Sequence, residues 1–219
     1  MRLNKFLALH TTLSRRGADK EIENGRVTIN GVIANMGATV EDTDEVRING
    51  KLLEQSQEFK TILFHKPTGY ICSREGQGSD TIYDILPKEY HNLNTVGRLD
   101  KESSGLLLLT NNGDFANKLT HPRYGKVKRY EIQLDKPLLP LHQQMISDYG
   151  VTLTDGPSKL SLLKRDKSGK LFEVVMSEGR NRQIRRTFSA LGYRVVKLHR
   201  TQFGDYHLGA LGVSKTKLI

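Results

Sequence analysis

The sequence of 219 residues contains a single cysteine, Cys72, which excludes an internal disulfide framework and a metal site built from cysteines. We interpret Cys72 as a small apolar side chain in or beside a strand. No apolar run approaches the roughly 18 residues of a membrane-spanning helix. The N-terminus is not followed by the apolar segment of a secretory signal. We therefore expect a cytoplasmic protein that does not enter a membrane.

Signature motifs of several enzyme classes are also missing. The seven histidines never fall three to five residues apart, and no His-Glu-x-x-His sequence occurs. No serine lies in a Gly-x-Ser-x-Gly elbow, and there is no glycine-rich phosphate loop or dinucleotide fingerprint. These absences disfavour a metalloenzyme, a serine hydrolase and a nucleotide-dependent enzyme. We expect neither a metal nor a cofactor.

Acidic residues are scarce in the second part of the chain. Residues 1–59 contain 8 basic and 9 acidic side chains, whereas residues 60–219 contain 26 basic and 15 acidic ones. The overall net charge is +10. A field of this sign favours a polyanionic partner, nucleic acid first and an anionic membrane surface second. The membrane is the weaker choice, because no basic amphipathic helix displays large apolar residues.

The first sixty residues have the pattern of a small module with two helices followed by hairpin strands. Leu3, Phe6 and Leu7 share one helical face. Ser14 suits the N-cap of a second helix, which Gly25 would end. Two Asn-Gly dipeptides, at 30–31 and 49–50, predict tight turns.

The two predicted helices carry a concentration of positive charge, although the module as a whole is nearly neutral. Residues 2–24 contain five basic side chains, Arg2, Lys5, Arg15, Arg16 and Lys20. Together with the Arg2-Leu3-Asn4-Lys5 and Ser14-Arg15-Arg16 sequences and the Asn-Gly turns, residues 1–50 resemble an S4 domain, a small RNA-binding module. The resemblance implies that these five side chains face folded RNA. The alternative is a solvated helical pair.

The polar stretch from Glu54 to Lys60 is a plausible linker, so we predict domains at residues 1–58 and 59–219. In the second domain the apolar pattern predicts strands near 61–64, 70–72, 106–109, 129–134, 160–163, 171–176 and 194–198, and helices near 115–119, 138–149 and 181–191. Consecutive strands with few crossover helices predict an α+β fold with a mixed, mainly antiparallel sheet flanked by a few helices.

One carboxylate, Asp100, lies in an unusual loop bracketed by Gly97, Arg98, Lys101 and Gly105. Neighbouring cations favour the ionised form of a carboxylate, which could then act as a nucleophile or base. Glycines let a ligand approach the backbone closely. The residues alone fit equally an aspartate in a salt-bridged surface turn, which is the commoner situation.

A second resemblance covers nearly the whole chain and favours a catalytic role for Asp100 over a salt-bridged surface turn. Ordered sequence blocks resemble those of the pseudouridine synthases, most closely the ribosomal RNA branch that carries an N-terminal S4 domain. The blocks are Lys66-Pro67-x-Gly69-Tyr70, Gly97-Arg98-Leu99-Asp100 with Ser104-Gly105-Leu106, Lys126-x-Lys128-Arg129-Tyr130, Glu178-Gly179-Arg180-x-x-Gln183-Ile184-Arg185-Arg186 and Val196-x-Leu198-x-Arg200. Two departures are Arg182, where the family usually has His, and His65, where Asn is common.

The resemblance implies isomerisation of a uridine in structured RNA, most often ribosomal RNA, without a cofactor. It assigns Asp100 as the essential carboxylate, Tyr130 as the residue that stacks on the flipped base, and Arg185 as the partner of the carboxylate. It further implies RNA or substrate contacts for Arg98, Leu198, Arg182 and Arg186. For Tyr130 and Leu198, ordinary packing in a strand is the alternative.

Two other functions remain open at this point. A non-catalytic RNA-binding factor for ribosome assembly could keep the same fold, although the presence of Asp100, Tyr130 and Arg185 argues against it. A pseudouridine synthase acting on tRNA is the other alternative. For the function that the resemblance favours, we expect a monomer whose partner is RNA, either ribosomal RNA or a pre-ribosomal particle.

Overall fold

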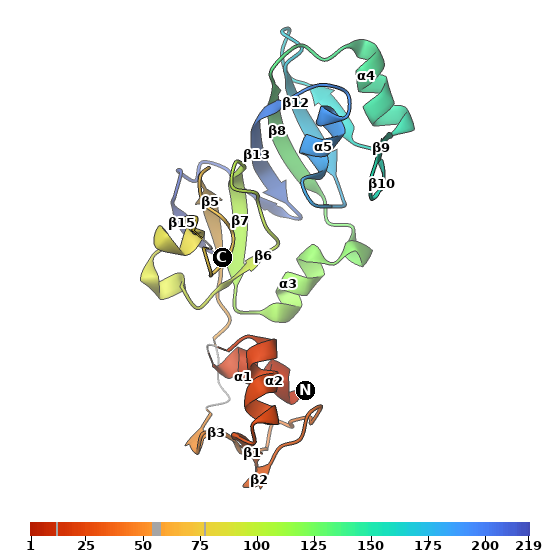
Figure 1. Ribbon diagram of the computed structural model, residues 1–219. Helices are drawn as coiled ribbons and strands as arrows, with labels where there is room; N and C mark the ends of the chain where they lie inside the picture. The colour runs from red at the N-terminus through yellow and green to blue at the C-terminus, as the bar shows by residue number, and fades with distance from the viewer. Residues whose placement is uncertain (12, 54–57, 77) are drawn as a thin grey trace. The chain divides into compact units, whose positions relative to one another are not determined.

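The computed structural model describes residues 1–11, 13–53, 58–76 and 78–219 (Figure 1). The chain forms two compact units, Met1–Phe59 and Lys60–Ile219. Most of the expected linker, residues 54–57, lies outside the described residues. The two units are described separately below.

The N-terminal unit packs two helices on a small antiparallel sheet with strand order β2-β1-β3-β4. Its elements are α1 (Leu3–His10), α2 (Arg15–Glu23), β1 (Val27–Ile29), β2 (Val32–Ile33), β3 (Val46–Ile48) and β4 (Lys51–Leu52). Leu3, Phe6 and Leu7 are at most 4% exposed, as their helical spacing predicts. Ser14 caps α2 by accepting the Gly17 N–H at 3.0 Å.

Both Asn-Gly dipeptides form the tight turns that the sequence predicts. Asn30 and Gly31 have φ values of 50° and 81°, and Asn49 and Gly50 have 50° and 77°. Consecutive left-handed residues define the type I′ turn, whose twist matches an antiparallel hairpin. These turns fix the β1–β2 and β3–β4 pairings.

The second unit is built on one large mixed sheet with strand order β11-β12-β8-β13-β7-β5-β15, in which β6 pairs with β7 and β14 with β13. Every pairing is antiparallel except β13 with β7. The strands are β5 (Thr61–Lys66), β6 (Asn94–Val96), β7 (Ser104–Thr110), β8 (Lys128–Leu134), β11 (Ser161–Lys164), β12 (Leu171–Met176), β13 (Val195–Phe203), β14 (Tyr206–His207) and β15 (Thr216–Leu218). A separate hairpin consists of β9 (Val151–Leu153) and β10 (Gly156–Ser158).

Few helices accompany this sheet. They are α3 (Gly113–Thr120), α4 (Pro140–Gln144), which continues as a π-helical turn η4 (Met145–Tyr149), and α5 (Gln183–Ser189), with short 3₁₀ turns η1 (Ile82–Asp84), η2 (Lys88–Tyr90) and η3 (Pro122–Tyr124). This is the α+β architecture that the sequence predicts. Among the described residues no helix is both long and apolar enough to cross a membrane.

The strand expected at 70–72 does not form. Ile71 makes one isolated bridge to Thr81, and the Sγ of Cys72 accepts the Leu99 N–H at 3.5 Å instead of joining a ladder. Local β-propensity is overridden here because these groups are used to hold neighbouring loops. Cys72 packs against the main core, and burial raises the pKa of its thiol.

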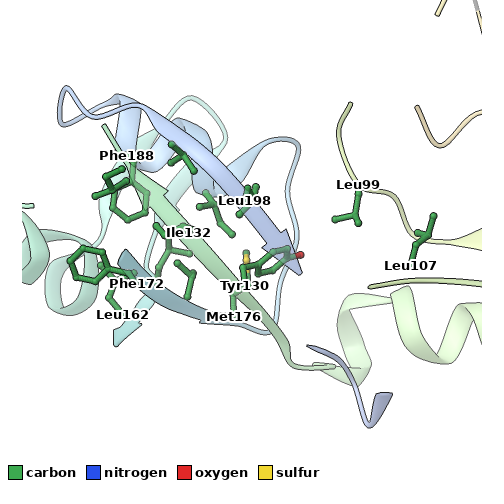
Figure 2. Close-up of a cluster of buried hydrophobic side chains, with 14 of the residues drawn as sticks. Leu99, Leu107, Tyr130, Ile132, Leu162, Phe172, Met176, Phe188 and Leu198 are labelled. Carbon is green, nitrogen blue, oxygen red and sulfur yellow. The ribbon is translucent and has the colours of Figure 1, made fainter. Parts of the chain in front are cut away.

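Strand β7 is buried on both faces. Leu107 and Leu109 join the core that includes Ile132, Phe172 and Phe188 (Figure 2), whereas Leu106 and Leu108 join a second core on the other face. All four leucines are fully buried, and each contributes roughly 1.5–3 kcal/mol. The loop that carries Asp100 therefore leads into a strand that is buried on both faces.

Candidate active site

A cavity of about 210 Å³ lies beside the point where β13 and β7 run parallel. Its walls come from five parts of the chain: the loop 97–103, Thr120 and Pro122 at the end of α3 and in η3, the beginning of β8, the end of β12 with residues 177–184, and β13. The structure brings together Arg98, Asp100, Tyr130, Arg182 and Leu198 from the sequence-derived set around this one cavity.

Asp100 occupies the loop between β6 and β7. Gly97, with φ of 70°, gives the loop its left-handed bend, and the Asp100 carbonyl accepts the Ser103 N–H at 3.0 Å to close a turn. The Asp100 side chain is 29% exposed, so its carboxylate is accessible from the cavity.

Lys66, at the end of β5, holds the backbone of this loop through its side-chain ammonium. Its Nζ is buried and donates to the carbonyls of Pro67 at 2.9 Å, Asp100 at 3.2 Å and Ser103 at 2.8 Å. Burial lowers the pKa of Lys66, and the nearby acidic groups oppose that shift. The ammonium thus fixes the backbone on both sides of the turn that carries Asp100.

Arg182 provides the ion-pair contact to Asp100. Its Nη1 lies 3.8 Å from Asp100 Oδ2 and 2.8 Å from Glu102 Oε2, so one nitrogen stands between two carboxylates. The hydrogen bond lowers the pKa of Glu102 and raises that of Arg182. Arg182 is held in the left-handed region at φ 45°, immediately before α5.

The expected pairing of Arg185 with the Asp100 carboxylate is not found between these two described residues. Arg185 donates to the Val195 carbonyl at 2.7 Å and the Glu102 carbonyl at 3.1 Å, with a longer contact to Ser103 Oγ at 3.4 Å. Burial lowers the pKa of Arg185, and Arg182 adds to the effect. Arg185 therefore joins the start of β13 to the loop of Asp100 through backbone carbonyls.

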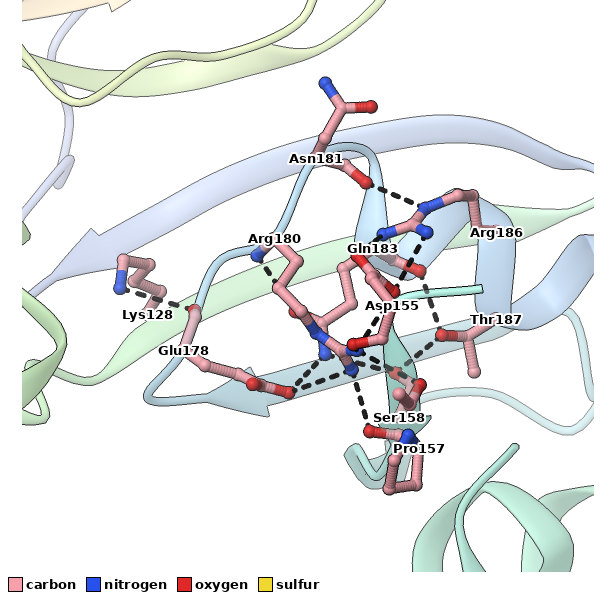
Figure 3. A network of polar contacts seen from close by, with 11 residues as sticks. Lys128, Asp155, Pro157, Ser158, Glu178, Arg180, Asn181, Gln183, Arg186 and Thr187 are labelled. Atoms are coloured by element: carbon pink, nitrogen blue, oxygen red, sulfur yellow. Dashed lines mark hydrogen bonds and ion pairs between the residues drawn. The ribbon is translucent and has the colours of Figure 1, made fainter. Parts of the chain in front are cut away.

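Arg186 is engaged in a polar network next to the cavity (Figure 3). Its guanidinium contacts Asp155 Oδ1 and Oδ2 at 3.1 and 2.7 Å. Arg180 donates to the same carboxylate at 3.0 Å and to the carbonyls of Gly156 and Pro157. The hydrogen bond from Arg186 lowers the pKa of Asp155. The network ties the β9–β10 hairpin to the segment before α5, and it occupies the Arg186 side chain that we expected to contact RNA.

The cavity has an apolar wall opposite the loop of Asp100. Tyr130 of β8 and Leu198 of β13 are 8% and 6% exposed, and Met176 and Ile184 lie beside them. Figure 2 shows the Tyr130 ring and Met176 next to each other at one end of the apolar cluster. Such a wall suits the face of a planar ring, so Tyr130 and Leu198 combine a packing role with access to the cavity.

Positive charge predominates in the cavity lining, which has two acidic residues, Asp100 and Glu178, against five basic ones: Arg98, Lys128, Arg180, Arg182 and Arg200. Arg98 is exposed. Lys128 donates to the carbonyls of Lys126, Ser177 and Glu178 at 3.3–3.4 Å, and burial lowers its pKa, with Arg200 adding to the effect. This charge favours an anionic ligand.

Sequence reasoning gave no role to several residues that shape the site. Lys66, Lys128 and Arg200 belong to the sequence blocks quoted above, and this membership could have identified them as part of the site. No feature of the sequence pointed to Glu102 or Asp155. Within the described parts of the chain, no group of three His, Cys, Asp or Glu side chains could hold a metal ion.

The five basic residues of the N-terminal unit that we expect to face RNA lie on its two helices and just before α1. Arg15, Arg16 and Lys20 are exposed on α2, Arg2 is exposed at the start of α1, and Lys5 is half-buried. Arg15 donates to Asn4 Oδ1 at 3.3 Å, and Arg2 donates to the Gly37 carbonyl. Most of this charge is accessible to an anionic partner.

Comparison with known proteins identifies two family matches. Residues 60–190 match the model of RNA pseudouridylate synthases, and residues 1–46 match the S4 domain. A ribosomal large subunit pseudouridine synthase B of Bacillus subtilis is 36% identical over 217 residues, covering 96% of this chain and 88% of the relative. A ribosomal small subunit pseudouridine synthase A of Pasteurella multocida is 36% identical and covers 95% and 90%, respectively.

A solved structure leads to the same group. The crystal structure of a pseudouridylate synthase aligns with all of this chain and 96% of its own, with a TM-score of 0.71 and 31% identity. The correspondence thus includes the cavity, the sheet and the N-terminal unit. On these grounds the chain belongs to the RNA pseudouridylate synthases that carry an N-terminal S4 domain, and it is an RNA uridine isomerase.

Proposed function

We propose that this enzyme converts a specific uridine of ribosomal RNA into pseudouridine, with Asp100 as the essential carboxylate. The observation that carries the proposal is the placement of the Asp100 carboxylate and the Tyr130 and Leu198 side chains around one basic cavity. The ribosomal substrate is supported by the names of the relatives, which act on the large or the small subunit.

The isomerisation breaks the N1–C1′ bond of uridine and joins C5 to C1′, after which C5 loses its proton and N1 bears one. Asp100 either attacks C1′ or removes a sugar proton, and both routes require an ionised carboxylate held in a fixed direction. Arg182, itself paired with Glu102, lies beside the Asp100 side chain. Lys66 donates to the Asp100 carbonyl, and Arg185 donates to the Glu102 carbonyl of the same loop.

The uracil ring would lie between the carboxylate and the apolar wall. Tyr130 and Leu198 would contact the faces of the ring and keep it in place while it turns. Because a paired uridine cannot reach such a cavity, it must be flipped out at a cost of a few kcal/mol. The exposed Arg98 is suited to fill the vacated position or to hold a phosphate.

The two units of the chain would have different functions, RNA binding in the N-terminal unit and catalysis in the second. The N-terminal unit would bind RNA through Arg2, Lys5, Arg15, Arg16 and Lys20, with the domain boundary near residue 58. We further propose that the protein acts as a monomer in the cytoplasm. Size-exclusion chromatography with light scattering tests the monomer.

A pseudouridine map of total RNA from cells with and without the gene tests the substrate. The proposal expects the loss of one or a few pseudouridines from ribosomal RNA and their return with the wild-type gene. Loss confined to tRNA would support the alternative substrate. An unchanged map in all RNA would contradict the proposal.

A further inference from the structure

A second basic surface lies at the end of the sheet opposite the cavity, where three loops meet. The β11–β12 turn, the loop after β8 and the loop before β13 are joined by backbone hydrogen bonds, Leu138 N–H to Gly169 O at 2.9 Å and Asp135 N–H to Arg194 O at 3.0 Å. The β11–β12 turn is the uppermost loop in Figure 1. This distal basic surface contains Lys136, Lys164, Arg165, Lys167, Lys170 and Arg194.

The cations of this surface are accessible. All are exposed except Lys170, which is half-buried. Arg165 pairs with Glu173, and Lys170 donates to the Asp135 carbonyl at 3.2 Å. Within the described residues the side chains of Lys164, Lys167 and Arg194 have no hydrogen-bonding or ionic partner, so their charges are available to a ligand.

The two acidic residues of the loops offset part of this positive charge, but neither forms an ion pair with Lys164, Lys167 or Arg194 among the described residues. Asp135 accepts the backbone N–H groups of Arg194 at 3.0 Å and Lys136 at 3.1 Å. Asp166 accepts the Ser168 hydroxyl and the Leu171 N–H. These hydrogen bonds lower both pKa values, with the Arg194 N–H the main cause for Asp135 and the Ser168 hydroxyl for Asp166. Both carboxylates are therefore used to build the loops, which present the cations outward.

The surface is separated from the cavity by the length of β8. Lys128 lines the cavity at one end of this strand. At the other end, the Leu134 N–H donates to the carbonyl of Lys170, which belongs to the distal basic surface. Six steps of about 3.3 Å make this separation about 20 Å. A single flipped nucleotide in the cavity cannot reach that far, so a ligand that touches both sites must be an extended polyanion.

We propose that the distal basic surface binds the phosphate backbone of the RNA that flanks the target uridine. The choice of RNA rests on the proposed function. The six side chains are lysines and arginines that can contact phosphates, and none of them offers an aromatic ring to stack on a base. The surface would therefore contribute affinity and orientation without reading sequence.

The test compares two triple variants with equal charge change. Lys164→Gln/Lys167→Gln/Arg194→Gln removes the three unpartnered cations. Lys88→Gln/Lys215→Gln/Lys217→Gln removes three exposed lysines from η2, β15 and the residue before it. The dissociation constant for an RNA duplex of about 20 base pairs is measured over a range of salt concentrations, with thermal denaturation as a check on folding.

The distal variant should flatten the slope of log Kd against log salt by about 0.7–0.9 per lost contact, thus by roughly 2.1–2.7 for three contacts, whereas the control variant should leave it nearly unchanged. The single-turnover rate of pseudouridine formation by the distal variant, measured at saturating enzyme, should equal that of the wild type. Equal slope changes in both variants, or none in the distal one, would overturn the proposal. If the wild type forms no pseudouridine, the proposed function fails, while the slopes still decide whether the surface binds RNA.

Discussion

Arg185 connects two elements that must keep their register for Asp100 to act. Its Nη1 donates to Val195 of β13 and its Nη2 to Glu102 of the Asp100 loop. Lysine keeps the charge but is shorter and lacks the planar fork whose two terminal nitrogens each reach a different carbonyl, so we expect Arg185→Lys to lose at least one of the two contacts. At least one charge-assisted hydrogen bond is lost, which costs about 1.5–3 kcal/mol of stability.

The same substitution should also lower the rate of the reaction. A loop displacement of about 1 Å can cost roughly 100-fold in turnover, and Arg185 is one of the groups that set the position of this loop. We therefore expect Arg185→Lys to lower the single-turnover rate by about 100-fold. Arg186→Lys is the matched control, because Arg186 contacts the partly exposed Asp155 and should change the rate only a few-fold.

Release of tritium from RNA containing 5-tritiated uridine measures the rate at saturating enzyme, which separates chemistry from binding. Circular dichroism confirms that both variants are folded at the assay temperature. Equal rates for the two variants, or a larger loss for Arg186→Lys, would refute the role assigned to Arg185.

Three further predictions concern other parts of the molecule. Lys66→Met leaves three backbone carbonyls without their donor and should lower the free energy of unfolding by about 3 kcal/mol, whereas Lys101→Met, at an exposed position, should change urea denaturation little. Deletion of residues 1–59 should leave a folded catalytic unit, judged by a cooperative thermal transition, with a flatter salt dependence of RNA binding. Asp155 has a pKa below its ordinary 3.8 in the folded state, so its stabilisation is present above that value and is lost as the pH falls through the lower one. Asp155→Asn should therefore reduce the difference in urea midpoint between about pH 7 and about pH 3.

Local features of the fold could be predicted from sequence because neighbouring residues determine them. The Ser14 cap and the two Asn-Gly turns depend on the conformations of a few adjacent residues. The buried strand around Leu106–Leu109 is apparent from its unbroken apolar run. The strand predicted at 70–72 does not form, because the backbone of Ile71 and the Sγ of Cys72 form hydrogen bonds with loop residues instead of with a neighbouring strand. Such tertiary contacts cannot be predicted from the local sequence.

The composition of the cavity could be predicted from ordered blocks, but the contacts within it could not. Lys66 reaches carbonyls 34 and 37 residues away, and Arg182 reaches Glu102 across 80 residues. Which arginine faces Asp100 depends on the rotation of α5 and on the left-handed residue before it. These are tertiary features, so the resemblance led to Arg185 and the structure places Arg182 beside the carboxylate.

Replacement of Asp100 by asparagine tests the central claim most directly. Asp100→Asn retains the size of the side chain, and the backbone contacts of Lys66 and Ser103 to residue 100 do not involve the carboxylate. RNA affinity should remain close to that of the wild type, because it depends mainly on the basic residues. Tritium release from 5-tritiated uridine in the substrate RNA should be abolished. Release at the wild-type rate would contradict the assignment of Asp100 as the essential carboxylate.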